Sequence, residues 1–101
     1  MNALIYQGVG EISLEERGKP TLEHPTDVIV QNILTGVCGT DRNIYAGRFP
    51  AESGVIRGHE AVGIVHEVGS AVTDLAAGDR VIVNPTLPCR SCRYCRDRKW
   101  A

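Results

Sequence analysis

The chain has 101 residues, of which 43% are hydrophobic and 23% charged, and its formal net charge is −1 at pH 7. That length suffices for one small domain and not for two, and the composition excludes collagen, disordered and coiled-coil proteins. The longest apolar run near the start covers only residues 3–6 (ALIY), so we expect neither a signal peptide nor a membrane span.

The first half of the chain predicts three strands and a short helix. Strands over 3–6 and 12–16 flank the turn Gly8-Val9-Gly10, as in a hairpin. Residues 27–34 (DVIVQNIL) are β-branched and apolar on both faces, which predicts a buried strand. Residues 40–46 predict one or two helical turns, ended by the glycine that follows.

The second half predicts a loop over 48–58 and two more strands. Residues 61–68 alternate, with Val62, Ile64 and Val68 on one face, and residues 80–84 (RVIVN) follow a glycine turn. Five short strands with little helix favour a mainly β fold, either a barrel or a sandwich. We expect the barrel, because closure removes exposed strand edges.

A first group of reactive side chains follows predicted strands. Cys38 opens the turn Cys38-Gly39-Thr40-Asp41, and His59 and Glu60 open the strand over 61–68. Strand ends at a barrel rim can face one another, and a thiolate, an imidazole and a carboxylate form a zinc site with one open position. In that case Thr40 passes a proton and Asp41 fixes the His59 tautomer. The alternative is a buried structural cysteine, a loop histidine and a surface carboxylate.

A second group is the cluster Cys89-x-x-Cys92-x-x-Cys95. Thiols this close, without a secretory signal, indicate metal ligands in a reducing, cytoplasmic setting rather than disulfides. Residues 90–99 also hold five basic residues against one acidic residue, Asp97, so this segment carries +4 and the other residues sum to −5. A solvated loop around the metal explains these charges, with a nucleic-acid contact as the alternative.

The order of these motifs resembles that of zinc-dependent medium-chain alcohol dehydrogenases, on the side of the sorbitol/polyol and threonine dehydrogenases. The resemblance rests on Cys38-Gly39-Thr40-Asp41, then residues 58–63 (GHEAVG), residues 78–81 (GDRV) and the cysteine cluster. It covers nearly the whole chain. It implies a GroES-like barrel with a cysteine-rich zinc lobe, and it implies that residues 1–101 are the N-terminal part of that catalytic domain.

The resemblance implies roles for individual residues. Cys38 and His59 match ligands of the catalytic zinc, and Glu60 matches an acidic residue that is a direct or exchangeable ligand; the usual third protein ligand would fall beyond residue 101. Thr40 matches the start of the proton relay, and Asp41 the carboxylate behind the ligands. Cys89, Cys92 and Cys95 match three of four structural zinc ligands, and the fourth would fall at position 103.

The sequence departs from the family pattern at three points. Arg98 stands where relatives often carry glycine, and a left-handed turn would strain an arginine there, so we expect that loop to be displaced. Gly39 replaces a basic residue that some relatives use against the cofactor pyrophosphate. No dinucleotide-binding G-x-G-x-x-G follows a strand, so we expect a fragment that lacks the Rossmann domain and is inactive alone.

For the full-length parent, the resemblance implies hydride transfer from an alcohol or polyol to NAD or NADP, with zinc polarising the alcohol oxygen. A homo-oligomer acting on a small molecule is expected, without a membrane or nucleic-acid partner. Two alternatives stay open, a stand-alone zinc module whose basic lobe contacts nucleic acid and a non-catalytic GroES-like scaffold.

Overall fold

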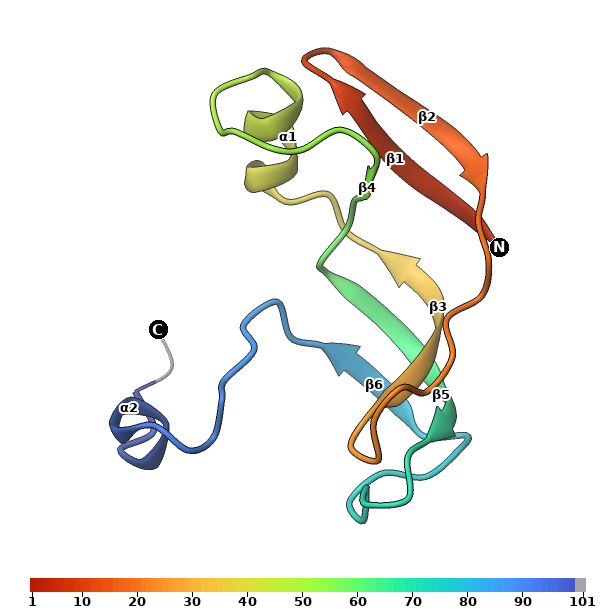
Figure 1. The fold of residues 1–101 in the computed structure, drawn as a ribbon, viewed down its shortest axis with the longest axis vertical. Helices are drawn as coiled ribbons and strands as arrows, with labels where there is room; N and C mark the ends of the chain where they lie inside the picture. Colours follow the sequence, from red (N-terminus) through yellow and green to blue (C-terminus); the bar gives the residue numbers. More distant parts are fainter. Residues whose placement is uncertain (100–101) are drawn as a thin grey trace.

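The computed structural model describes residues 1–99, in which six strands and two short helices are formed (Figure 1). Their bounds are β1 Asn2–Gly8, β2 Glu11–Glu16, β3 Val28–Thr35, α1 Gly39–Tyr45, β4 Val55–Ile56, β5 Ala61–Val68, β6 Arg80–Val83 and α2 Arg93–Arg96. The predicted mainly β class is confirmed, and each predicted strand and the predicted helix are present. Two elements were not predicted: β4, which lies inside the expected loop over 48–58, and the single turn α2.

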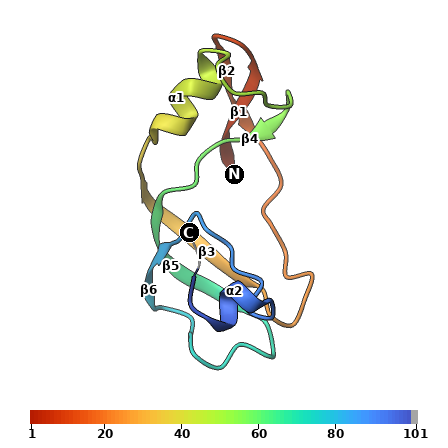
Figure 2. The same cartoon turned by 90° about the vertical axis from the view of Figure 1, so that its left-hand side faces the viewer.

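The strands form two antiparallel sheets of three, in the orders β2-β1-β4 and β3-β5-β6. Figure 1 shows the first sheet beside α1 and the second below it, and Figure 2 shows the same separation from the side. Within residues 1–99 no hydrogen-bonded ladder joins the two sheets, so both keep open edges and the expected closure is not reached there.

The β1–β2 hairpin supplies most of the small core. Tyr6 faces Ile12 across the ladder, and the chain reverses at Gly10, whose φ of 74° suits glycine. Ala3, Ile5 and Tyr6 are buried, joined by Ile44 of α1 and by Val65 of β5. The two buried positions of β5, Gly63 and Val65, are therefore on the face opposite to Val62 and Ile64.

The strand β3 is less buried than its sequence suggests. Its first three residues are half-buried, whereas the rest are exposed; Ile33 is 57% exposed and Leu34 69%. The prediction of burial on both faces is therefore wrong, because β3 is the edge strand of a three-stranded sheet and no other segment of residues 1–99 covers its second half.

The described chain is more open than a compact domain of its size. Its radius of gyration is 15.6 Å, against about 13 Å for a compact chain of 100 residues. The lobe that carries α2 stands away from both sheets in Figure 1. None of the helices in residues 1–99 is long and apolar enough to cross a membrane.

At Gly63 the β3-β5-β6 sheet leaves no room for a side chain. A Cβ on Gly63 would collide with Val30 Cγ1 and come within 2.5 Å of the Gln31 carbonyl oxygen. We expect Gly63→Ala to lower the free energy of unfolding by about 1–3 kcal/mol, the usual cost of overpacking, as measured from the urea midpoint. Gly18→Ala is the control, because a Cβ there meets nothing within 4 Å. Equal midpoints for the two variants would contradict the close approach of β3 and β5.

Candidate metal centre

The start of α1 positions Cys38 and Asp41. Cys38 is the N-cap residue, with extended backbone at φ −75° and ψ 156°. Its backbone N–H donates to Asp41 Oδ2 at 3.0 Å, which satisfies a donor that the helix leaves free. One turn of helix thus fixes the Asp41 carboxylate beside the Cys38 side chain.

The strand β4 brings His59 to the same place. Backbone hydrogen bonds from Gly54 N to Tyr6 O at 2.8 Å and from Arg57 N to Leu4 O at 2.9 Å hold this segment along β1. His59 follows two residues after Arg57, and its Nδ1 lies 3.5 Å from Asp41 Oδ1. That carboxylate oxygen is buried and has no hydrogen-bond partner in the described residues. Asp41 is therefore free to accept the Nδ1–H of His59 and fix its ring.

Glu60 reaches the site because a glycine, Gly36, directly follows β3. Gly36 N donates to Glu60 O at 2.7 Å, and Thr35 Oγ1 donates to the same carbonyl at 3.0 Å. A Cβ on Gly36 would lie 2.7 Å from Glu60 Oε2. The absent side chain of Gly36 therefore leaves the room that the Glu60 carboxylate occupies.

The three segments converge on one set of donors. A sulfur of Cys38, a ring nitrogen of His59 and a carboxylate oxygen of Glu60 all lie within 4.8 Å of one another. Thiolate, imidazole and carboxylate are the ligand types of zinc, and three of them leave one tetrahedral position open. The donor set therefore fits a zinc ion of the catalytic type.

Local hydrogen bonds favour the ionised thiol. The backbone N–H of Thr40, followed by the side chains of His59 and Thr40, lowers the pKa of Cys38. The hydrogen bond with Cys38 in turn raises the pKa of His59, and Asp41 adds to this effect. Both pKa shifts favour the charged forms of the two side chains, and a metal cation would compete with protons for the same atoms.

Thr40 lies beside the donor set. Its Oγ1 is 3.7 Å from Cys38 Sγ, and its side chain belongs to an exposed residue of the first helical turn. A hydroxyl at this position can exchange a proton with the site on one side and with water on the other.

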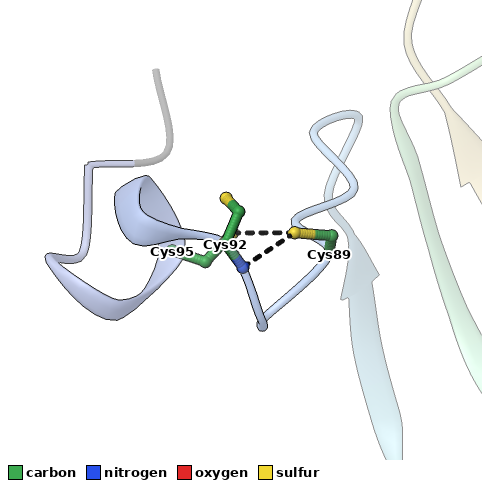
Figure 3. Close-up of side chains that lie close together, drawn as sticks. All are labelled: Cys89, Cys92 and Cys95. Carbon is green, nitrogen blue, oxygen red and sulfur yellow. Dashed lines mark hydrogen bonds between the residues drawn. The ribbon is translucent and has the colours of Figure 1, made fainter.

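The cysteine lobe forms a second donor set. Figure 3 shows Cys89, Cys92 and Cys95 grouped around the start of α2. Cys89 Sγ accepts the Cys92 N–H at 3.3 Å and lies 3.7 Å from Cys95 Sγ. The three sulfurs lie within 4.8 Å of one another, which fits one tetrahedral zinc with three thiolates.

Backbone N–H donors favour the thiolate form of Cys89, which is the form that binds a metal. The N–H groups of Cys92 and Ser91 lower the pKa of Cys89 to about 6, whereas burial raises the pKa of Cys95.

Arg98 adopts a φ of 56°. The left-handed turn is therefore kept with arginine in it, and our expectation of a displaced loop is wrong.

The structure thus brings the predicted site residues together in two groups. Asp41 and Thr40 lie against Cys38, His59 and Glu60, and the three lobe cysteines form the other group. Thr35 and Gly36, which hold Glu60, were not predicted; the only local signal was a glycine after a predicted strand.

The chain is similar in sequence to known proteins. Residues 24–101 match the profile of the family described as "Alcohol dehydrogenase GroES-like domain". The chain is 37% identical to "Probable D-xylulose reductase A" of Neosartorya fischeri, over 97% of this chain and 28% of that protein. It is 40% identical to a zinc-type alcohol dehydrogenase-like protein of Schizosaccharomyces pombe, over 100% of this chain and 24% of that protein.

Solved structures share the fold. The alcohol dehydrogenase of Thermus sp. ATN1 superposes with a TM-score of 0.92 at 37% identity, over 99% of this chain and 29% of that one. The expected GroES-like fold is therefore confirmed. The chain spans about 28% of the length of the first curated relative that it matches.

Proposed function

The chain belongs to the family of alcohol dehydrogenase GroES-like domains, and on that premise we propose that it is the zinc-binding part of an alcohol or polyol dehydrogenase. The observation that carries the proposal is the convergence of Cys38, His59 and Glu60, with their donor atoms within 4.8 Å. The names of the relatives favour a polyol or another alcohol as substrate. A similar zinc-binding dehydrogenase from Sinorhizobium meliloti was solved bound to NADP, which favours NAD(P) as hydride acceptor. The sequence contains no glycine-rich nucleotide fingerprint, so we propose no nicotinamide site within these residues.

Each residue of the site then has a task. Cys38 and His59 would hold the zinc, and Glu60 would be the third ligand, through its carboxylate. Asp41 Oδ1, 3.5 Å from His59 Nδ1, is placed to accept the Nδ1–H and so leave Nε2 for the ion. Asp41 also accepts the backbone N–H of Cys38 at the N-cap. Its role is to position both ligands.

When bound, zinc supplies the Lewis acid that polarises the alcohol oxygen, and the nicotinamide accepts the hydride. Thr40 accepts the proton of the alcohol and releases another to water, since its hydroxyl lies 3.7 Å from Cys38 Sγ on the exposed side of the helix. The three cysteines of the lobe hold a structural zinc that keeps α2 folded.

Two other functions make different predictions about metal. A nucleic-acid-binding zinc module needs only the lobe cysteines, and a scaffold needs no zinc. The second oxygen of Asp41, which lies 3.5 Å from His59 Nδ1 and is not used in capping α1, favours a histidine held as a metal ligand and thus the dehydrogenase.

The proposed activity is tested by completing the enzyme. Residues 1–99 replace the matching part of the Thermus dehydrogenase, whose fold superposes with a TM-score of 0.92. We expect the chimera to reduce NAD(P) with alcohols or polyols. We expect no turnover by the isolated chain, because its sequence contains no dinucleotide-binding fingerprint. Steady turnover by the isolated chain, or a folded, zinc-loaded chimera without activity on any alcohol, would refute the proposal.

A further inference from the structure

A cavity of about 380 Å³ lies where β6 leads into the cysteine lobe. It is lined by Asn84, Thr86, Pro88, Arg90 and Cys95. None of these residues is acidic, and three of them carry side-chain hydrogen-bond donors: an amide, a hydroxyl and a guanidinium. Donors without a neighbouring carboxylate suit an anionic ligand.

The charge around this cavity is not neutralised locally. Residues 89–99 carry +4 from their Arg, Lys and Asp side chains, and three cysteine thiolates (−3) around one Zn²⁺ (+2) would leave +3. Their one acidic residue, Asp97, lies 4.0 Å from Arg93 in an exposed pair. Arg90 has no acidic partner within 4 Å in residues 1–99. Its five guanidinium donors are thus available to a ligand with paired oxygens, such as a phosphoryl group.

Two further contacts shape the donors. Asn84 Oδ1 accepts the Thr86 N–H at 2.9 Å, so the donor end of the Asn84 amide stays available. Arg90 has a φ of 59°, a backbone region that favours glycine. Arginine adopts this backbone region at a conformational cost, and residues that bear such a cost cluster at functional sites. The strained backbone is therefore consistent with a binding role for the Arg90 guanidinium.

We propose that this cavity binds a tetrahedral oxyanion of the phosphate class, with Arg90 as its main ligand and Thr86 and Asn84 as further donors. The cavity begins at the sheet end where the first metal site lies, because Asn84 follows Val83, which pairs with Ala61 next to Glu60. The ligand is either free inorganic phosphate or the phosphoryl group of a small molecule. The proposal stands on the cavity itself and does not need the dehydrogenase activity.

The test is a titration of the isotope-labelled chain with inorganic phosphate, followed by amide NMR shifts and referenced to chloride at equal ionic strength. We expect saturable shifts at Thr86 and Arg90. Arg90→Gly should weaken the affinity about tenfold or more, the loss expected for a charge-assisted hydrogen bond. Glycine takes a φ of 59° without strain, so this variant should stay folded.

Arg98→Gly is the matched control. It removes the same charge from the same lobe, also at a left-handed residue with φ 56°, but Arg98 does not line the cavity. We expect its affinity to change by less than about twofold, because an exposed charge outside the cavity is screened by salt. Equal losses in both variants, or shifts that never saturate, would show diffuse attraction and overturn the proposal.

Two further titrations distinguish the two possible sources of the ligand, and distinguish a failure of the phosphate site from a failure of the proposed dehydrogenase function. If sorbitol 6-phosphate binds more tightly than inorganic phosphate and sorbitol alone does not bind, the ligand is a phosphorylated small molecule. If the two phosphates bind equally well, the ligand is free phosphate. Cys38→Ser should bind phosphate as the unchanged chain does. Loss of phosphate binding in Cys38→Ser would contradict the independence of this cavity, whatever the chimera's activity shows.

Discussion

Replacing Cys38 by Ser in the chimera with the Thermus dehydrogenase is expected to lower kcat/KM by at least about a thousandfold, since the Lewis acid is lost with its sulfur ligand. Loss of an outer partner of a ligand already costs about 10–100-fold in metal affinity, and loss of the ligand itself costs more. In the chain alone, bound zinc should fall by one ion. Turnover of the chimera and zinc content by elemental analysis measure the two effects.

Cobalt substitution shows which site has lost its metal. Cys38 gives a site with one sulfur and the lobe gives a site with three, so the thiolate charge-transfer absorbance should fall by about a quarter in Cys38→Ser if every sulfur contributes equally. The fold should be unchanged, because Cys38 contributes its backbone N–H to Asp41 and serine keeps that group. Normal turnover by a zinc-depleted Cys38→Ser chimera would show that Cys38 has another role.

Replacing Cys92 by Ser is expected to unfold the lobe and leave the first site intact. Three sulfurs within 4.8 Å repel one another as thiolates unless a cation lies between them. The lobe has few other contacts, since the single turn α2 buries none of its residues. We therefore expect at least about a hundredfold weaker zinc binding in the lobe and loss of amide protection over 89–99 in hydrogen exchange.

The two variants are reciprocal controls. Cys92→Ser should retain the cobalt spectrum of the site with one sulfur, and Cys38→Ser that of the site with three. In the chimera, activity lost through Cys92→Ser should follow unfolding and return at lower temperature, whereas activity lost through Cys38→Ser should not. A Cys92→Ser chain with full lobe protection and one zinc fewer would show that the ion does not hold the lobe together.

Local patterns predicted most of the secondary structure. Alternation over 61–68 and the β-branched run over 80–84 each gave a strand at nearly the expected bounds. The turn after Cys38 gave α1, because a carboxylate three residues into a helix can accept the N-cap N–H. β4 was not predictable, since two residues carry no periodicity and form a strand only by pairing with Ile5 and Tyr6.

The metal-ligand types and their spacing in the chain were likewise readable from the sequence, and so was the family that their order resembles. The tertiary structure decided whether those ligands meet. Cys38 and His59 are 21 positions apart, and nothing local relates them; pairing of β4 with β1 and of β3 with β5 brings them together. The tertiary structure also decided how exposed β3 is and which donors surround Arg90, because exposure and cavities depend on segments that are distant in sequence.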